Sequence, residues 1–362
     1  MANKLDEARK IINEVDSQMA ELFVKRMRAA EMVYEHKKEF GLPIYDEKRE
    51  SEVIEKNLIL IKDEVLKEYY VDYLKHLMSV SRAYQNRLQS GLKVAYSGVE
   101  GAFAHISAGK IFPQANRVSY SDFKAAYNSV LNGECDVAVL PIENSYAGEV
   151  GQTMDLIFSG NLYVNGIYEL EIRQNLLALP DATINDIKKV VSHPQALSQC
   201  HEFIQNHNFV IEEANNTAFA AKTVAESNNK SLAAIASAET AELYGLEVIK
   251  ANINKSSENT TRFVVLSKVL AKTKIMSNTV LMLTVKNAAG SLASAISIIA
   301  KYGYNMTALR SSPLKKQSWQ YYFYIEIDGS VNSENGKQML EELKNVCDIL
   351  KIAGTFAPHT QI

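Results

Sequence analysis

The chain is poor in the residues that interrupt or cross-link a fold. Its 362 residues include 16 glycines, 7 prolines and 3 cysteines. Glycine and proline this scarce exclude a collagen-like or low-complexity chain. The cysteines, at positions 135, 200 and 347, lie far apart, and neither CxxC nor HExxH spacing occurs. We therefore expect reduced thiols, no metal site and a cytoplasmic protein.

Strong charge of one sign and long apolar runs are also missing. The formal net charge is −3, and no window holds the ~18 apolar residues of a membrane span. The first residues, MANKLDEARK, lack the apolar core of a signal peptide. These features argue against nucleic acid and a membrane as partners. Apolar residues make up 47% of the chain, ample for two or three domain cores at ~100–200 residues per domain.

The pattern along the chain predicts three domains. Residues 4–90 are rich in helix formers, with Gly41 and Pro43 as their only breakers, and predict an all-α three-helix unit. Residues 93–270 alternate short β-rich runs with helical stretches, which predicts an α/β domain with a mostly parallel sheet. Residues 278–358 follow the βαββαβ order of a ferredoxin-like domain. We place the domains at 1–90, 93–270 and 278–358.

The first helix, expected from residue 4 to residue 38, carries cations on its apolar face. At ~100° per residue, the apolar side chains from Ile12 to Val33 share one face. Arg26 and Lys37 fall in the middle of it, and Arg9 falls near its edge. One such cation can reach solvent from a narrow stripe, but two together favour an anion site. So long a helix cannot bury its face within 90 residues, so we expect an intertwined dimer.

The next two helices carry polar residues at the same spacing. Asp46, Arg49 and Glu50 share one face after Pro43. They are either a helix cap with a solvated ion pair or part of a site. Ser81 and Gln85 are polar positions on the apolar stripe of the third helix.

Polar residues also follow two predicted strands of the central segment. CDVAVLPIENS (135–145) ends in Glu143, Asn144 and Ser145, and SHPQALSQC (192–200) places His193 and Gln195 at a strand–helix junction. Ligands of open α/β sheets bind at the carboxyl ends of strands. These residues are therefore candidates for a ligand site.

Two further stretches of this segment carry candidate groups. NNTAFAAK (215–222) places Asn216 and Thr217 as N-caps before a helix, whose free N–H groups could take a carboxylate; capping alone is the alternative role of Thr217. NTTRFVVL (259–266) places Thr261 and Arg262 at the start of a strand.

Together these motifs resemble the bifunctional chorismate mutases/prephenate dehydratases that end in an ACT domain. The first segment carries R-x6-D…R…K…D-x2-R-E…S-x3-Q. The second carries GVEGAFA, VAVLPIENS, SHPQALSQC, ASAETAELYGL and TTRFVVL. The resemblance implies conversion of chorismate to prephenate and then to phenylpyruvate, with possible control by phenylalanine. It implies no cofactor.

The resemblance implies a chorismate site in the first segment. Arg26 would bind one carboxylate, and Arg9 of the partner subunit would bind the other. Lys37 and Gln85 would donate to the ether oxygen, and Glu50 would hold the ring hydroxyl. The supporting residues would be Asp46, Arg49 and Ser81. A Claisen rearrangement needs no nucleophile and no proton transfer, so a held conformer and well-aimed donors suffice.

The resemblance implies a two-lobed dehydratase, similar to a periplasmic binding protein, with its site in the cleft. Thr261 would be the catalytic hydroxyl, and Arg262 would hold a carboxylate. His193 is an alternative acid, although a histidine at a junction more often caps or packs. The implied prephenate-binding residues are Glu143, Asn144, Ser145, His193, Gln195, Thr217, Thr261, Arg262 and Phe263.

In the third segment the resemblance to an ACT domain implies an amino-acid sensor or, alternatively, a purely dimerising module. The family stretches GALV and ESRP appear here as GSLA (290–293) and RSSP (310–313). The change to Arg310 either loses a salt bridge or moves a positive charge by two residues along the same strand face; we favour the second. The implied phenylalanine-binding residues are Gly290, Ser291, Leu292, Arg310, Ser311 and Pro313.

Two other interpretations keep the fold. One is a two-lobed small-molecule sensor with a helical dimerisation arm, against which Arg26 and Lys37 argue. The other is a prephenate decarboxylase that keeps the ring hydroxyl and should lack Thr261. The small-molecule partners implied are chorismate, prephenate and phenylalanine, and the assembly implied is a homodimer or a homotetramer.

Overall fold

The computed structural model describes residues 3–254, 259–271, 277–314, 320–358 and 360–362. The chain divides into two compact units, residues 1–92 and 93–362. The boundary expected between residues 270 and 278 includes residues 272–276, which lie outside the described residues. No helix in the described ranges is long and apolar enough to cross a membrane.

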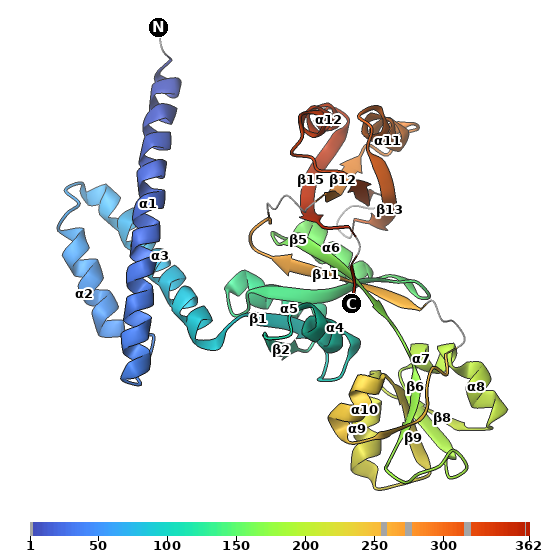
Figure 1. Ribbon diagram of the computed structural model, residues 1–362. Helices are drawn as coiled ribbons and strands as arrows, with labels where there is room; N and C mark the ends of the chain where they lie inside the picture. Colours follow the sequence, from blue (N-terminus) through green and yellow to red (C-terminus); the bar gives the residue numbers. More distant parts are fainter. Residues whose placement is uncertain (1–2, 255–258, 272–276, 315–319, 359) are drawn as a thin grey trace. The chain divides into compact units, whose positions relative to one another are not determined.

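The first unit consists of three helices, as predicted (Figure 1). The helices are α1 (Lys4–Glu39), α2 (Glu47–Leu58) and α3 (Glu64–Ser90). Asn3, Asp46 and Asp63 cap the three N-termini with their side chains, because their oxygens accept from first-turn N–H groups. Gly41 follows α1 with φ +65°, a conformation that favours glycine.

Much of the apolar face of α1 is exposed within one chain. Leu22 is 63% exposed and Phe23 is 42% exposed, whereas Ala30 and Tyr34 are buried. The buried apolar side chains of α3 are Leu74 and Met78. An exposed apolar stripe of this length is typical of an interface, so the dimer stays a prediction that this face supports.

The second unit begins with two lobes of α/β structure. The first lobe has β1 (Lys93–Ser97), α4 (Phe103–Ile111), β2 (Asn116–Tyr120), α5 (Phe123–Asn132), β3 (Val137–Asn144), β4 (Gly148–Glu149), α6 (Gly151–Ser159), β5 (Tyr163–Glu171) and β11 (Thr260–Ser267). The second lobe has β6 (Asn175–Ala178), β7 (Lys189–Ser192), α7 (Pro194–Gln199), α8 (His201–Asn206), β8 (Val210–Glu213), α9 (Thr217–Ser227), β9 (Leu232–Ala236), α10 (Ala238–Tyr244) and β10 (Glu247–Lys250). The chain leaves the first lobe after β5 and returns in β11.

The predicted mostly parallel sheet is wrong in one respect, because both sheets are mixed. In the first lobe β1 pairs parallel to β2 and β3, but β11 lies antiparallel between β3 and β5. In the second lobe β7 pairs parallel to β8 and β9, and β6 pairs antiparallel to β9 and β10. The physical reason is the second lobe: β5 carries the chain out of the first lobe, so the returning strand β11 runs the other way beside it.

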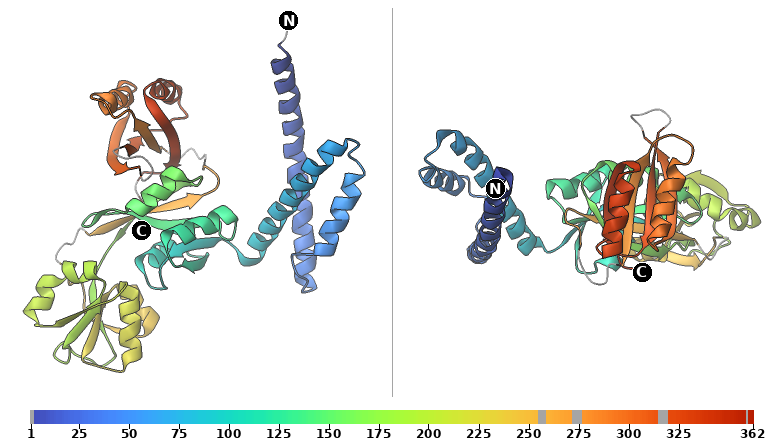
Figure 2. Two further views of the ribbon diagram at one scale, coloured as in Figure 1. Left: turned by 180° about the vertical axis from the view of Figure 1, so that it is seen from behind. Right: turned by 90° about the horizontal axis from the view of Figure 1, so that it is seen from above.

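The last part of the second unit has the predicted βαββαβ order. Its elements are β12 (Asn278–Val285), α11 (Ser291–Lys301), β13 (Asn305–Pro313), β14 (Tyr321–Asp328), α12 (Glu334–Lys344) and β15 (Cys347–Phe356), followed by β16 (Thr360–Gln361). The strand order is β13-β14-β12-β15. Helices α11 and α12 cover the same face of these strands (Figure 2).

The opposite face of these strands packs on the first lobe. Met282 and Tyr324 share one buried core with Leu140, Met154 and Ile157. Strand β15 also joins β5, since Gly354 pairs with Val164. A Cβ at position 354 would lie 2.0 Å from the Val164 carbonyl oxygen, so this approach requires glycine. Residues 278–358 are therefore built into the same unit as the first lobe.

Candidate active sites

In the helical unit, Arg26 of α1 contacts the polar positions of α3. Its Nη1 donates to Ser81 Oγ and, at 3.4 Å, to the Leu77 carbonyl oxygen. Ser81 Oγ in turn donates to the Leu77 carbonyl at 3.0 Å. Burial lowers the pKa of the Arg26 guanidinium, yet an arginine remains charged at neutral pH. The pair therefore presents a fixed positive charge between two helices.

Gln85 lies one turn after Ser81 and is 7% exposed. Its Oε1 is buried and has no hydrogen-bond partner among the described residues. A buried amide oxygen without a partner is costly unless a ligand satisfies it. Rotation of the amide by 180° puts the donor Nε2 at the same position. Lys37 does not join this group in one chain, because its Nζ donates to the Ile44 carbonyl oxygen.

The remaining predicted residues of this unit do not gather around Gln85. Asp46 caps α2 by accepting from Arg49 N at 2.9 Å, which is the plain capping interpretation. Arg49 pairs with Glu52 at 3.2 Å on the surface. Arg9 is exposed, 3.9 Å from Asp6. If Arg9 takes part in a site, it can do so only from a second subunit.

Glu50 forms an ion pair with Arg82, a residue that the sequence reasoning missed. The Arg82 guanidinium also lies 5.2 Å from the ring centroid of Tyr45. A signal was available, because Arg82 follows Ser81 directly and lies one turn before Asn86 on α3. In the described structure Glu50 is thus already engaged by a cation.

The second unit contains a cavity of about 370 Å³ lined by residues of both lobes. This volume is in the range of small-molecule sites. Of the nine predicted prephenate-binding residues, the cavity brings together Asn144, His193, Gln195, Thr217, Thr261 and Phe263. Lining residues that the sequence reasoning missed include Glu149, Gln174, Gln199 and Asn215. Gln199 lies within the quoted SHPQALSQC run, so its polar type was the only available signal.

Asn144 organises the polar wall of this cavity. Its Nδ2 donates to Thr261 Oγ1 and to Asn259 Oδ1, both at 2.9 Å. Its Oδ1 accepts from the backbone N–H groups of Tyr146 and Ala147 at 3.0 and 2.9 Å. Gln195 Nε2 reaches the same oxygen from the other lobe at 3.4 Å. The Thr261 oxygen therefore accepts from a fixed donor, which leaves its own proton for another acceptor.

Helix N-termini supply the positive ends of dipoles around the cavity. Ala102 and Phe103 open α4, Val150 precedes α6, and Thr217 opens α9, and all four residues line the cavity. Neither Ala102 nor Val150 caps its helix with a side chain, whereas Asn216 caps α9 by accepting from Phe219 N at 2.7 Å. The lining residues within the described ranges include no lysine or arginine. An anion in this cavity would thus be held by backbone N–H groups rather than by cations.

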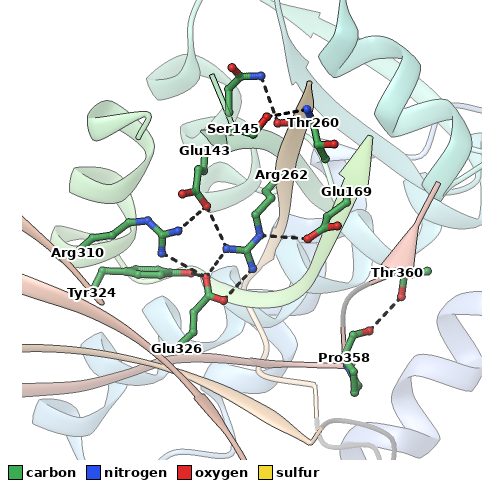
Figure 3. Close-up of polar contacts among 11 residues, drawn as sticks. Glu143, Ser145, Glu169, Thr260, Arg262, Arg310, Tyr324, Glu326, Pro358 and Thr360 are labelled. Carbon is green, nitrogen blue, oxygen red and sulfur yellow. Dashed lines mark hydrogen bonds and ion pairs between the residues drawn. The ribbon is translucent and has the colours of Figure 1, made fainter. Parts of the chain in front are cut away.

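Three predicted cleft residues, Glu143, Ser145 and Arg262, do not line the cavity. Successive side chains of a strand point to opposite faces, so Thr261 and Phe263 face the cavity and Arg262 faces away. Ser145 Oγ instead accepts from Thr260 N at 3.0 Å. The expectation that Arg262 holds a substrate carboxylate is corrected, because its partners are carboxylates of the protein (Figure 3).

Arg262 belongs to a buried ionic cluster between the first lobe and strand β14. Its Nη1 and Nη2 donate to the two carboxylate oxygens of Glu326 at 3.0 and 2.8 Å, and Nη1 donates to Glu143 at 3.2 Å. Arg310 also pairs with Glu143 (Figure 3). Burial opposes the charge of Glu143, but Arg310 and Arg262 outweigh burial and lower the pKa of its carboxyl.

Arg310 is therefore not beside the other predicted effector residues. Arg310 pairs across the strands with Tyr324, whose ring belongs to the core shared with the first lobe. Gly290 and Leu292 lie at the start of α11, which covers the opposite face of the same strands. Ser311 alternates with Arg310 and shares the α11 face. The predicted effector residues that remain on that side are Gly290, Ser291, Leu292 and Ser311, whereas Pro313 ends β13 and lines a separate cavity with Asp155 and Tyr322.

Comparison with known proteins agrees with this division. Residues 8–86 match the family model of chorismate mutase type II, and residues 94–270 match that of prephenate dehydratase. A bifunctional chorismate mutase/prephenate dehydratase of Aquifex aeolicus is 30% identical over 98% of this chain and 98% of its own. An arogenate dehydratase/prephenate dehydratase of Arabidopsis thaliana is 32% identical over 75% of this chain and 74% of its own.

A solved structure is similar to about three quarters of the chain. The prephenate dehydratase of Arthrobacter aurescens, in complex with L-Phe, is 25% identical. It covers 74% of this chain and 90% of its own, with a TM-score of 0.68. The likeness thus extends to a protein whose fold holds an amino acid.

Proposed function

The chain belongs to the family of bifunctional chorismate mutases/prephenate dehydratases, and we propose how its own residues perform the two reactions. It rearranges chorismate to prephenate, and it converts prephenate to phenylpyruvate with loss of CO2 and water. The first activity belongs to residues 8–86 and the second to residues 94–270.

In the mutase reaction, the protein binds a dianion in a compact conformer. Arg26, held by Ser81, binds one carboxylate, and Arg9 of a second subunit binds the other. Gln85 donates to the ether oxygen as negative charge develops there, and its buried amide oxygen without a partner, which rotation exchanges for the Nε2 donor, supports this role. Lys37 is the second donor to that oxygen, once chorismate replaces the Ile44 carbonyl as its acceptor. Glu50 holds the ring hydroxyl.

In the dehydratase reaction, Thr261 is the general acid. Its hydroxyl gives a proton to the departing ring hydroxyl, which leaves as water. The ring carboxylate leaves as CO2, and its bonding electrons complete the aromatic ring. Water then restores the Thr261 proton, so one proton is consumed for each phenylpyruvate formed. The single observation that carries this role is the 2.9 Å hydrogen bond from Asn144, which fixes Thr261 Oγ1 at the cavity wall.

The substrate carboxylates bind to helix N-termini. The first turns of α4 and α9 open into the cavity from the two lobes, and a dianion would draw both lobes together around it. Gln195, whose side chain already bridges the lobes to Asn144, completes the polar wall. This arrangement replaces the carboxylate-binding role first expected of Arg262.

We propose that residues 278–358 form an ACT domain that binds phenylalanine and inhibits the dehydratase. The complex of the Arthrobacter aurescens relative with L-Phe supports this proposal. The effector would lie by Gly290, Ser291, Leu292 and Ser311, on the α11 side of the strands. The exposed face of α1 supports assembly as a homodimer, or as a homotetramer of two such pairs.

One product assay tests the function. Purified chain given chorismate should consume its absorbance band and form phenylpyruvate. Prephenate given directly should yield the same product. A product that keeps the ring hydroxyl would instead support a decarboxylase, and no turnover of either compound would contradict both activities.

A further inference from the structure

Two neighbouring residues on each of two paired strands point to opposite sides of the dehydratase sheet. In the register of β3 and β11, Thr261 lies opposite Asn144, and Arg262 lies opposite Glu143. The first pair faces the cavity, and the second pair faces strands β13 and β14. One peptide unit on each strand thus separates the proposed catalytic hydroxyl and its donor from a pair of charges on the other face.

Those charges are held by the C-terminal strands. Glu326 is 1% exposed, and its carboxylate accepts hydrogen bonds from both terminal nitrogens of Arg262. Tyr324 donates to the same carboxylate at 2.7 Å. Arg310 pairs with Glu143 and lies 5.7 Å from the Tyr324 ring centroid. Side chains of β13 and β14 therefore bind the end of β3 and the start of β11 (Figure 3).

The Arg262–Glu326 pair fixes the orientation of the start of β11. A bidentate pair between an arginine and a carboxylate fixes orientation as well as distance. Removing one member leaves its buried partner uncompensated, so the strand end has to shift or admit water. A hydroxyl that protonates a leaving group has to be placed within a fraction of an ångström, and a misplacement of ~1 Å costs ~10²-fold in rate.

We propose that Glu326 and Arg310 are positioning residues of the dehydratase, which hold Thr261 and Asn144 in catalytic geometry through Arg262 and Glu143. The C-terminal domain is then a working part of the dehydratase site, besides any sensing role. This inference rests on the proposed role of Thr261. It also names the contacts through which movement of β13 and β14 would reach the reaction.

The first experiment is Glu326→Gln in the full chain, with both activities measured. The dehydratase kcat should fall by about tenfold or more, with KM changed by less than about threefold, because orientation is lost while the helix N-termini that bind the dianion remain. Mutase turnover should stay within about twofold, since it belongs to residues 8–86. The matched control is Glu342→Gln.

The control matches the kinds of contact but not the burial, because the Glu342 side chain is 34% exposed and Glu326 is 1% exposed. Glu342 accepts from Lys301 at 2.7 Å and from Tyr302 at 2.9 Å, on helix α12 of the face away from the first lobe. Its variant should keep kcat within about twofold. Equal losses in the two variants would mean that any lost charge of this domain acts through general destabilisation, and the proposal would fall.

A double-mutant cycle separates positioning from stability. In a Thr261→Ala background there is no hydroxyl to orient, so Glu326→Gln should lower the residual dehydratase rate by less than about twofold. A tenfold loss in that background would overturn the proposal. If Glu326→Gln does not fold, as judged by its thermal transition, Tyr324→Phe takes its place, because it removes only one donor to Glu326. A smaller fall in kcat is then expected, and an unchanged kcat would contradict the inference.

Failure of this inference differs from failure of the proposed function. A parent chain that makes no phenylpyruvate contradicts the function itself. A parent that turns over prephenate, with folded variants as fast as the parent, contradicts only the positioning role.

Discussion

At the scale of single residues, the proposed mechanisms of the two reactions use different donor groups. Gln85 offers an amide donor at every pH. Thr261 offers a hydroxyl proton, and its oxygen already accepts a hydrogen bond from Asn144. The sequence singles out both residues because their types match the chemistry and their motifs carry them, and their roles stay predictions. Arg82 follows Ser81 directly, but nothing local in the sequence shows that it pairs with Glu50 of another helix.

Gln85→Glu should make mutase activity depend on acid. An ionised glutamate would repel the charge that develops on the ether oxygen, whereas a protonated one can still donate. Turnover should therefore fall by about tenfold or more between pH 5 and pH 8. A pH–rate profile of the variant measures this. A profile parallel to that of the parent would show that Gln85 does not donate to the ether oxygen. Dehydratase activity of the same variant serves as the internal control.

Thr261→Ala should lower the dehydratase kcat by ~10²-fold or more, since it removes a positioned proton donor. Thr261→Ser is the matched control and should retain most of the rate, because it keeps the hydroxyl. Prephenate should accumulate when the alanine variant is given chorismate. If phenylpyruvate formation stayed within a few-fold of the parent, another acid such as His193 would be responsible.

At the scale of elements, strand alternation decided which predicted residues reach the cavity. The sequence places Glu143, Asn144, Thr261 and Arg262 at strand ends, and the structure brings all four together. Only two face the cavity, because a strand turns alternate side chains to opposite sides. That choice depends on which face the neighbouring domain covers, and nothing local encodes it. The mixed order of the first sheet was unpredictable for a similar reason, since it follows from the inserted second lobe.

The ionic cluster should make the stability of residues 93–362 depend on pH. The pKa of Glu143 lies below its ordinary value of 4.5 in the folded state. A lowered carboxyl pKa contributes stability above the ordinary pKa, and that contribution is lost as the pH falls through the lowered value. The raised pKa values of Arg262 and Arg310 have no such effect, because arginine does not titrate in this range.

Glu143→Gln should therefore flatten the acid limb of the stability profile. Thermal midpoints measured from pH 6 to pH 3 should fall less in the variant than in the parent. Glu171→Gln is a control, because its carboxyl pairs with Arg173 on the surface and is screened by solvent. Identical profiles for parent and Glu143→Gln would show that the cluster contributes no acid-sensitive stability.

At the scale of the whole molecule, the C-terminal domain joins the dehydratase through one face and offers its helices on the other. The sequence predicted its order of elements, but not that Arg310 would pair with the first lobe. Positions 310 and 312 share one face of β13, as expected. That face packs against the dehydratase and not against α11. The charge reversal from the family motif is thus tied to an internal contact.

Arg310→Gln should separate effector binding from catalysis. Calorimetry should give a dissociation constant for phenylalanine within a few-fold of the parent, because the guanidinium faces away from α11. Dehydratase kcat should fall, because Glu143 loses a partner. A tenfold weaker affinity for phenylalanine, about the size of one charge-assisted hydrogen bond, would instead show that Arg310 contacts the effector.

The mutase site should be shared between two chains. Arg26 contacts Ser81 within one chain, whereas Arg9 is exposed and far along the same helix. The exposed face of α1, with Leu22 and Phe23, gives a second chain a surface on which to pack. If Arg9 of one chain serves the Arg26 site of the other, each single variant, Arg9→Ala or Arg26→Ala, should be nearly inactive as a mutase.

Mixing the two inactive variants tests this arrangement. In a mixed dimer one site collects both substitutions and the other site collects neither. Random reassembly after unfolding and refolding of an equal mixture should therefore restore about one quarter of the parent mutase activity, since half the dimers are mixed and each has one intact site. Arg26→Ala mixed with Ser81→Ala is the control, because both lie in the same site and no mixed dimer has an intact one. Activity that stays at the level of the separate variants would mean that each chain builds its own mutase site.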